Sequence, residues 1–311
     1  MSSVEAWRAR GHTRALLGHD IFVVDSAETH KPALVLLHGF PTSSWDWAPI
    51  WTELAARYRL VTPDLLGLGF SAKPKGRAYS ILEQADLCEA LVRALGLDAE
   101  PDTLPGGGLH VLAHDYGDTV AQELLARQLE GAGAGRWRSL CLLNGGLFPE
   151  THHPRTIQKL LLSPIGGLVG RLSSRAVFGR SFSAVFGPQT QPSPAELDDF
   201  WRIICHEQGP RVSHRLIHYM SERVEHRARW VGALRDTAVP LGLINGSVDP
   251  VSGAHMVARY RELLGSGDFI VELPGIGHYP QLEAPQQVLE AYLRFVEGAE
   301  AAGPQGRSRG S

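Results

Sequence analysis

The sequence predicts an α/β fold: a mostly parallel eight-stranded sheet with helices on both faces and an inserted helical cap. Apolar runs of strand length recur along the chain with amphipathic helical stretches between them, which is typical of a parallel sheet covered on both faces. This alternation stops after Asn144-Gly145-Gly146 and resumes near Val239. The residues between these points carry helical patterns, so they are predicted to form the cap.

The predicted strands are short and rich in aliphatic residues. They lie at residues 33–37, 59–62, 109–113, 140–143, 241–244 and 269–273, after a hairpin at 13–17 and 21–24. Helices are predicted at residues 81–95, 119–129, 254–263 and 286–295. The chain then divides into a first core part at 1–146, a helical cap or lid at 147–236, a second core part at 237–298 and a disordered tail at 299–311.

Composition excludes several classes of protein. The chain has 43% hydrophobic and 20% charged residues and a formal net charge of −3 without a basic cluster, so neither disorder nor nucleic-acid binding is expected. Its cysteines, Cys88, Cys141 and Cys205, are far apart and form no disulfide or metal motif. The spacing of His152 and His153 does not indicate a metal site either. We therefore expect no metal and no cofactor.

The sequence also lacks membrane and secretion signals. The N-terminal residues MSSVEAWRARGHTRALLGHD contain no apolar signal region, and no run of about 18 apolar residues occurs. These features favour a cytoplasmic protein without a membrane partner. It is expected to be a monomer or homodimer that acts on a small apolar organic substrate.

Asp115 lies at a predicted turn between a strand and a helix, in the sequence LHVLAHDYGDTVAQELL. In the α/β-hydrolase fold such a turn presents the nucleophile, and small residues such as Ala113 and Gly117 are needed two positions either side of it. The pattern lacks the first glycine of the usual motif, and Asp118 stands where a second small residue is common. Asp115 could instead cap the following helix, so this motif alone leaves both roles open.

Two further candidates follow the last two predicted strands. Asp249 lies in NGSVDP and His278 in GIGHYP, so nucleophile, acid and histidine appear in the order that α/β-hydrolases use. His278 is predicted to activate water while Asp249 orients its ring and stabilises the imidazolium. A loop aspartate before proline is otherwise a common turn residue, and a loop histidine is often merely exposed. The order of all three favours a catalytic triad.

The tetrapeptide HGFP directly follows the predicted strand at 33–37. In this fold such a turn supplies one backbone N–H of an oxyanion hole, here from Phe40, and the residue after the nucleophile, Tyr116, supplies the other. A tight turn without a catalytic role is the alternative interpretation.

A carboxylate nucleophile restricts the chemistry. Attack by Asp115 on an sp³ carbon gives an ordinary alkyl ester, whereas attack on an acyl carbon gives a mixed anhydride, so epoxides and alkyl halides are the favoured substrates. Haloalkane dehalogenases typically have tryptophan directly after the nucleophile, where this chain has Tyr116. Epoxide hydrolases typically combine HGFP-like turns with cap tyrosines that donate a proton to the epoxide oxygen.

The predicted cap contains a single tyrosine, Tyr219, which is the candidate proton donor. It could equally be a core residue of its helix. The second tyrosine is missing, and His214 or His218 could take its place. The predicted lining of the substrate pocket is Trp45, Leu147, Phe148 and His218.

The chain resembles the mesoderm-specific transcript homologues, within the epoxide hydrolase and haloalkane dehalogenase branch of the α/β-hydrolases. The segments that carry the resemblance include LLHGFPTSSWDW, DLLGLGFSAKP, HDYGDTVAQELL, SLCLLNGGLFPETH, VFGPQTQPS and IGHYPQLEAP. The resemblance implies the fold, the position of the lid and the triad Asp115, Asp249 and His278. It does not define the substrate.

Three hypotheses follow from the sequence. The first is an epoxide hydrolase with a covalent alkyl-ester intermediate. The second is a haloalkane dehalogenase or a hydrolase of strained lactones. The third is a non-catalytic protein that binds a small ligand on a hydrolase scaffold, because a fold does not fix a function.

Overall fold

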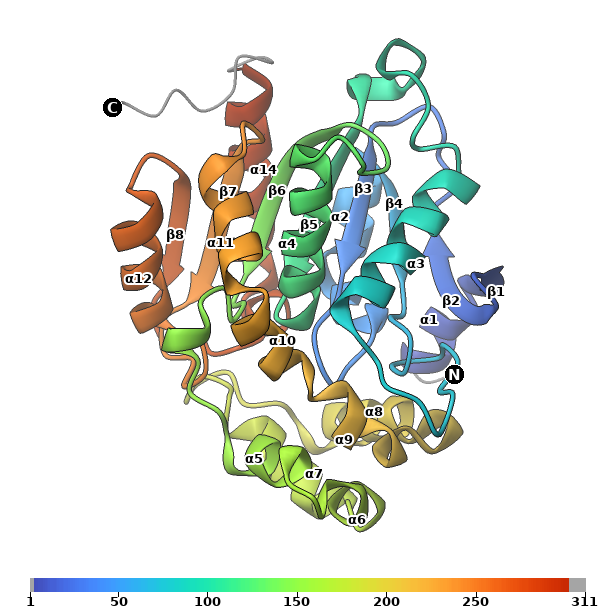
Figure 1. Ribbon diagram of the computed structural model, residues 1–311, viewed down its shortest axis with the longest axis vertical. Coiled ribbons are helices and arrows are strands. Elements are labelled where there is room, and N and C mark those ends of the chain that lie inside the picture. The colour runs from blue at the N-terminus through green and yellow to red at the C-terminus, as the bar shows by residue number, and fades with distance from the viewer. Residues whose placement is uncertain (1–2, 302–311) are drawn as a thin grey trace.

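The computed structural model describes residues 3–301, and its sheet confirms the predicted fold (Figure 1). The strands are ordered β1-β2-β4-β3-β5-β6-β7-β8. β1 pairs antiparallel with β2 and β2 with β4, and the remaining pairs are parallel. The strands are β1 (Gly11–Leu16), β2 (His19–Asp25), β3 (Ala33–Leu37), β4 (Arg59–Pro63), β5 (Leu109–His114), β6 (Trp137–Leu143), β7 (Leu241–Gly246) and β8 (Phe269–Leu273).

Helices cover both faces of the sheet, which explains why its central strands are buried throughout and mostly apolar. Every residue of β3 and β5 is buried, so neither strand shows the alternation of a half-exposed strand. One face carries α3 (Ile81–Ala94), α4 (Tyr116–Leu129), α11 (Arg227–Asp236) and α12 (Ala254–Leu264), and the other carries α2 (Ala48–Ala55) and α14 (Pro285–Ala301) (Figure 1). Two shorter helices are α1 (Ser3–Arg8) and α13 (Pro280–Glu283).

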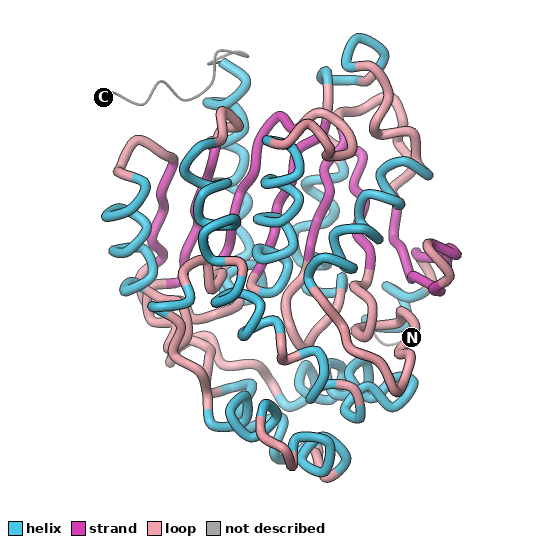
Figure 2. The backbone as a smooth tube through the Cα atoms, viewed as in Figure 1, coloured by secondary structure: helices cyan, strands magenta, loops and turns pink. Residues whose placement is uncertain are grey.

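The segment between β6 and β7 contains helices and loops but no strand within the described residues (Figure 2). Several of its helices lie together beyond the carboxyl ends of the strands, as Figure 1 shows. Its helices before α11 are α5 (Thr156–Leu162), α6 (Gly166–Arg171), α7 (Arg175–Ser183), α8 (Pro194–Cys205), α9 (Ser213–Leu216) and α10 (Tyr219–Glu225). Below, residues 147–236 are called the inserted segment. Its last helix, α11, returns to the sheet and packs beside α4.

Helix and strand ends differ in detail from the prediction. α4 begins at Tyr116 rather than at 119, because the chain turns into the helix directly after Asp115 although Gly117 and Asp118 are poor helix formers. α14 continues to Ala301, and the rest of the predicted tail lies outside the described residues. None of the helices between residues 3 and 301 combines the length and apolar character needed to cross a bilayer.

Gly117 is required where α4 passes over β3. A Cβ at this position would lie 2.3 Å from the carbonyl oxygen of Leu37. The substitution Gly117→Ala is therefore expected to lower the free energy of unfolding by about 1–3 kcal/mol. Gly232→Ala on α11 is the matched control, because its Cβ would meet no atom closer than 3.9 Å. Urea denaturation measures both variants, and wild-type stability in Gly117→Ala would contradict this close packing.

Candidate active site

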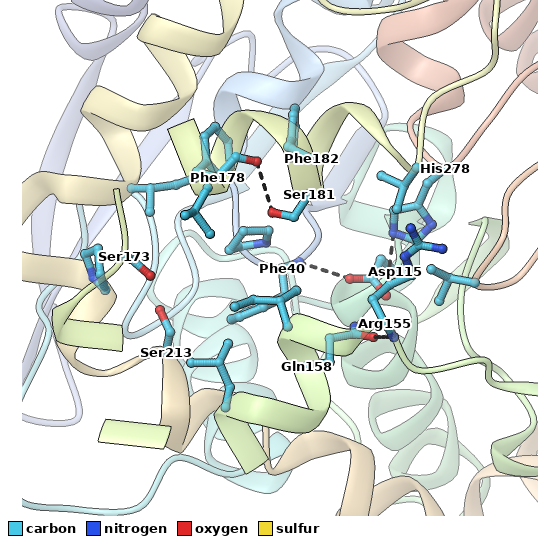
Figure 3. A pocket seen from close by; sticks show the side chains of 18 of the residues that line it. Phe40, Asp115, Arg155, Gln158, Ser173, Phe178, Ser181, Phe182, Ser213 and His278 are labelled. Carbon is cyan, nitrogen blue, oxygen red and sulfur yellow. Dashed lines mark hydrogen bonds and ion pairs between the residues drawn. The ribbon is translucent and has the colours of Figure 1, made fainter. Parts of the chain in front are cut away.

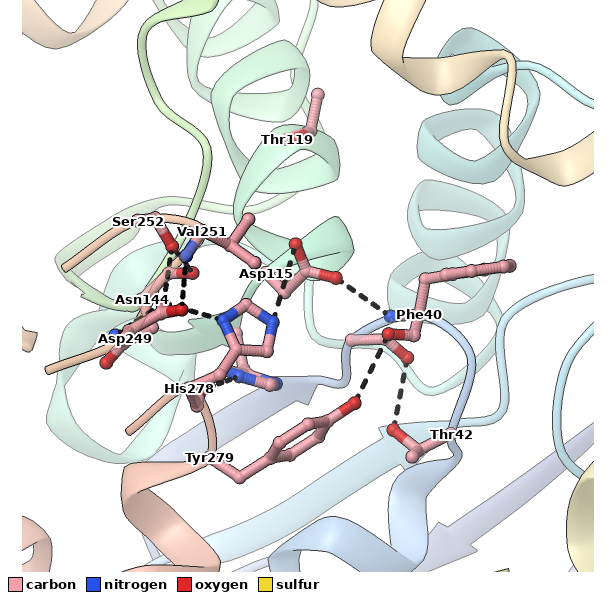
Figure 4. Close-up of polar contacts among 12 residues, drawn as sticks. Phe40, Thr42, Asp115, Thr119, Asn144, Asp249, Val251, Ser252, His278 and Tyr279 are labelled. Carbon is pink, nitrogen blue, oxygen red and sulfur yellow. Dashed lines mark hydrogen bonds and ion pairs between the residues drawn. The ribbon is translucent and has the colours of Figure 1, made fainter. Parts of the chain in front are cut away.

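The carboxyl ends of four strands bring the predicted site residues together (Figure 4). Phe40 follows β3, Asp115 follows β5, Asp249 follows β7 and His278 follows β8. The Nδ1 atom of His278 lies 2.7 Å from Asp249 Oδ2, and its Nε2 atom lies 4.0 Å from Asp115 Oδ1. The imidazole ring thus lies between two carboxylates, which is the arrangement that a nucleophile, a base and an orienting acid need.

Asp115 has a backbone conformation that non-glycine residues rarely adopt, with φ of 47° and ψ of −103°. Its side chain makes no capping hydrogen bond to α4, so the helix-capping interpretation is wrong. Instead, Asp115 Oδ2 accepts a hydrogen bond from the Phe40 N–H at 3.1 Å. The strained turn therefore presents the buried carboxylate to the HGFP turn and to His278.

Asp249 is held by neighbours that the sequence analysis did not identify. Its Oδ2 accepts hydrogen bonds from Asn144 Nδ2 and from Ser252 Oγ, both at 2.9 Å, and its Oδ1 accepts one from the Val251 N–H at 2.7 Å. Asn144 directly follows β6. A polar residue directly after a predicted strand could therefore have been identified as a candidate site residue from the sequence. These donors fix the carboxylate that orients His278.

The charges of Asp115, Asp249 and His278 shift the pKa of each of these three groups. Burial lowers the pKa of His278, but the carboxylates of Asp249 and Asp115 outweigh burial and raise it from 6.5 to about 9. Burial raises the pKa of Asp249, yet the charge and hydrogen bond of His278 bring it down to about 2. Burial also raises the pKa of Asp115, and His278 and Arg223 hold it below its usual value. At neutral pH the site therefore contains an imidazolium between two carboxylates.

Phe40 and Tyr116 provide the backbone N–H groups that were predicted to form an oxyanion hole. The Phe40 N–H already donates to Asp115 Oδ2, and the Phe40 carbonyl accepts a hydrogen bond from the Tyr279 hydroxyl at 3.3 Å. Tyr116 is the first residue of α4, where backbone N–H groups have no acceptor within the helix. Asp115 Oδ2 is consequently the oxygen beside the predicted hole, and Oδ1 is the oxygen that faces His278.

Arg223 is a buried site residue that the sequence analysis did not single out. Its Nη2 atom donates to the Asp115 carbonyl oxygen at 3.2 Å and lies 3.6 Å from Asp115 Oδ1, while Nε donates to Thr119 Oγ1 at 2.8 Å. The guanidinium also lies over the ring of Tyr219, 4.6 Å from its centre. The sequence feature that could have identified Arg223 is its spacing of four residues from Tyr219, which places both residues on one side of α10.

A largely apolar cavity lies over Asp115 and His278 (Figure 3). Much of its wall comes from the inserted segment, with aromatic and aliphatic side chains that include Val177, Phe178, Phe182, Trp201 and Ile204. Its polar lining residues include Arg155, Gln158, Ser173, Ser181 and Ser213. In Figure 3 the serine pair Ser173 and Ser213 lies at the end of the cavity opposite His278.

The four residues predicted to line the pocket lie elsewhere. Trp45 packs against Phe200, with ring centres 4.8 Å apart. Leu147 and Phe148 are buried in the helical layer on the α4 face of the sheet, and His218 is exposed. The prediction chose residues near the catalytic motifs in sequence, whereas the packing of α5, α7 and α8 determines the lining.

Tyr219 is buried beside the site, outside the lining of the cavity. The centre of its ring lies 5.0 Å from that of Tyr116 and 6.0 Å from that of Phe40. Burial raises the pKa of Tyr219, and a hydrogen bond with the Gln158 side chain opposes this shift. Because Gln158 lines the cavity, the Tyr219 hydroxyl lies one hydrogen bond behind the cavity wall. His214 is only half-buried and does not line the cavity.

Metal-binding side chains do not cluster in the described part of the chain. Between residues 3 and 301 no group of three or more histidine, cysteine, aspartate or glutamate side chains could hold a metal ion. The three cysteines are free thiols, of which Cys88 and Cys141 are buried.

The raised pKa of His278 can be tested directly. Asp115→Asn removes a negative charge 4.0 Å from the imidazole, so the pKa of His278 is expected to fall below about 9. Since a raised pKa means protonation persists to higher pH, wild-type His278 should remain an imidazolium between about pH 6.5 and 9, where the variant loses its proton earlier. An NMR titration of the imidazole measures both values, and identical titrations would contradict the ion pair.

Known proteins place this chain in a family. The model of the alpha/beta hydrolase family matches residues 34–291. The mesoderm-specific transcript homolog protein of Bos taurus is 43% identical over 94% of this chain and 88% of its own length, and the Mycobacterium tuberculosis protein LipZ is 42% identical over 94% and 98%. These relatives confirm the resemblance seen in the sequence.

Solved structures agree on the fold. A haloalkane dehalogenase loop variant from Bradyrhizobium elkanii superposes with a TM-score of 0.78 at 22% identity, covering 95% of this chain and 98% of that one. An alpha/beta hydrolase fold protein from Burkholderia ambifaria gives a TM-score of 0.73 at 24% identity, with 91% and 97% covered. By its sequence match and its fold, the chain belongs to the α/β-hydrolase family.

Proposed function

We propose that this hydrolase uses Asp115 as a nucleophile, forms a covalent alkyl ester with its substrate, and hydrolyses that ester with His278. Opening of an epoxide to a diol is the reaction that we favour. The observation that carries the proposal is the position of the Asp115 carboxylate, which lies at the strained strand-to-helix turn with Oδ2 against the Phe40 N–H and Oδ1 toward His278. A serine or cysteine nucleophile would occupy this position in an acyl-transfer enzyme.

In the first step Asp115 Oδ1 attacks an sp³ carbon of the epoxide. A bond forms between Oδ1 and that carbon, the carbon–oxygen bond of the ring breaks, and the resulting alkoxide takes up a proton. Tyr219 is the proposed donor of this proton. The step requires the Tyr219 hydroxyl to exchange its hydrogen bond with Gln158 for one with the epoxide oxygen.

Ester formation prepares His278 for the second step, because it removes the negative charge of Asp115 that helps to raise the pKa of His278. The imidazolium then releases its proton more readily, and this proton restores the Tyr219 hydroxyl. Neutral His278 accepts a proton from water as that water attacks the ester carbonyl. The N–H groups of Phe40 and Tyr116 stabilise the oxyanion on Oδ2. The bond between the carbonyl carbon and Oδ1 breaks, and the diol leaves with a proton from His278. The Asp115 carboxylic acid then gives its remaining proton to His278 and is again a carboxylate.

The two half-reactions can be separated by substitution. Asp115→Asn is expected to abolish turnover, while His278→Gln should form the ester without hydrolysing it. Intact-mass spectrometry after incubation with styrene oxide or stilbene oxide should then show His278→Gln heavier by the mass of one substrate. The exposed His153→Gln is the control and should turn over without a lasting adduct. An unmodified His278→Gln protein across a broad epoxide panel would reject epoxide opening.

Alkyl halides are the second candidate substrates, favoured by the Arg155 and Gln158 side chains in the lining, whose N–H groups could receive a departing halide. Bromide release from bromoalkanes, with the alkylated His278→Gln protein, would assign that reaction instead. Thermal stabilisation by these compounds without turnover or adduct would indicate a ligand-binding protein.

Arg223 is expected to keep Asp115 ionised during ester formation. Its guanidinium lies 3.6 Å from Asp115 Oδ1 and lowers the pKa of Asp115, so Arg223→Met should raise that pKa. As pH falls, the rate of adduct formation should then begin to drop at a higher pH than in the protein with Arg223. Arg223→Lys keeps a positive charge and should show a smaller rise in this pH. Single-turnover rates against pH in the His278→Gln background measure this effect, and overlapping acidic limbs would contradict it.

A further inference from the structure

The outer end of the inserted segment exposes an apolar surface. On and next to α6, Ile165, Leu168 and Leu172 are 56%, 55% and 70% exposed, and Val177 at the start of α7 is 38% exposed. The first three are spaced by three and four residues, so they lie on one side of the helical turn. These four residues are called the outer apolar face. Figure 1 shows α6 at the end of the molecule farthest from the sheet.

Packing on the other side of α6 fixes this orientation. A Cβ at Gly166 would lie 1.9 Å from the Leu161 carbonyl oxygen, and one at Gly170 would lie 2.2 Å from that of Pro210. The helix therefore contacts its neighbours through two glycines that allow close backbone approach. Ile165, Leu168 and Leu172 point away from the protein as a result, whereas Val169 packs against the core.

The charged side chains of residues 151–195, the stretch that carries the outer apolar face, are all positive. Residues 151–195 include Arg155, Lys159, Arg171, Arg175 and Arg180 but no aspartate or glutamate, although the whole chain carries a net charge of −3. Arg175 pairs with Asp198 of α8 at 2.6 Å. Lys159, Arg171 and Arg180 are exposed and form no ion pair with any residue from 3 to 301. Exposed apolar side chains beside unpaired cations complement the surface of an anionic lipid bilayer, which has an apolar interior beneath negatively charged headgroups.

The cavity over Asp115 reaches the same place. Val177 belongs to the outer apolar face and also lines the cavity, and Ser173, the neighbour of Leu172, lines it as well. In Figure 3, Ser173 lies at the end of the cavity opposite His278. A molecule that entered beside Val177 would therefore meet apolar walls before it reached the carboxylate.

We propose that the outer apolar face docks on the surface of an anionic lipid bilayer and that apolar substrates pass from the bilayer into the cavity. Docking is peripheral and replaces the expectation from sequence that no membrane is involved. A second copy of the chain fits the face less well, because a symmetric contact would bring Lys159, Arg171 and Arg180 near their own counterparts. Docking is independent of the reaction at Asp115, whereas the entry of substrate rests on the proposed function.

Vesicle flotation tests the docking. The full chain should float with phosphatidylcholine vesicles that contain phosphatidylserine. Its binding should be at least about tenfold weaker to pure phosphatidylcholine vesicles, and also to the anionic vesicles at high salt. The double variant Leu168→Ser with Leu172→Ser should lose most of this binding. Its control is Leu17→Ser with Leu129→Ser, whose leucines are 63% and 47% exposed outside the inserted segment and whose binding should match wild type. Circular dichroism melting verifies that each variant is folded.

Three results would overturn the proposal. They are no flotation of the wild type with anionic vesicles, an equal loss of vesicle binding in the two double-leucine variants, or wild-type vesicle binding by the double variant Arg171→Gln with Arg180→Gln. Concentration-dependent dimers that disappear only in the Leu168 and Leu172 variant would assign the face to a second copy. Flotation is repeated with Asp115→Asn, which should bind vesicles like wild type. A failure of the catalytic proposal therefore leaves the docking result unaffected.

Discussion

The placement of one imidazole between two buried carboxylates is the interaction on which the rest of the site depends. His278 lies 2.7 Å from one carboxylate and 4.0 Å from the other, and the positive charge of its imidazolium offsets the cost of burying their negative charges. This arrangement needs three strand ends at one edge of the sheet, and a strained backbone at Asp115 to turn its side chain toward the ring. It also explains how His278 could become a base for the second step of the proposed reaction, since the loss of charge on Asp115 lowers the proton affinity of His278.

The inserted segment is more than a cover over this centre. It contributes Arg223, whose guanidinium contacts the carbonyl and faces the carboxylate of Asp115. It also forms most of the apolar wall of the cavity. Movement of α10 would therefore change the electrostatic environment of Asp115, so the segment that lines the cavity also affects the charge of the proposed nucleophile. The same segment carries the outer apolar face at its far end, so the proposed route of substrate entry and the cavity wall belong to one segment.

The sequence predicted the sheet, its order of motifs and the three residues that meet at its edge, because these follow from local patterns: apolar runs, strained turns with small residues, and loops after strands. It did not predict Arg223 or Asn144, whose roles depend on contacts between segments far apart in the chain. The lining of the cavity was missed for the same reason. Trp45, Leu147 and Phe148 lie near the motifs in sequence, yet their side chains fill the core. The positions of α5, α7 and α8 decide which residues face the cavity.

The covalent role of Asp115 is the central claim, and the path of an oxygen atom tests it most directly. A single turnover of the wild-type protein with excess enzyme over epoxide in ¹⁸O-labelled water should place the label in the peptide that contains Asp115, because water attacks the ester carbonyl and Oδ1 leaves with the diol. The first diol formed should then be unlabelled. Labelled diol with an unlabelled Asp115 peptide would show direct attack of water on the substrate and would contradict the nucleophilic role of this carboxylate.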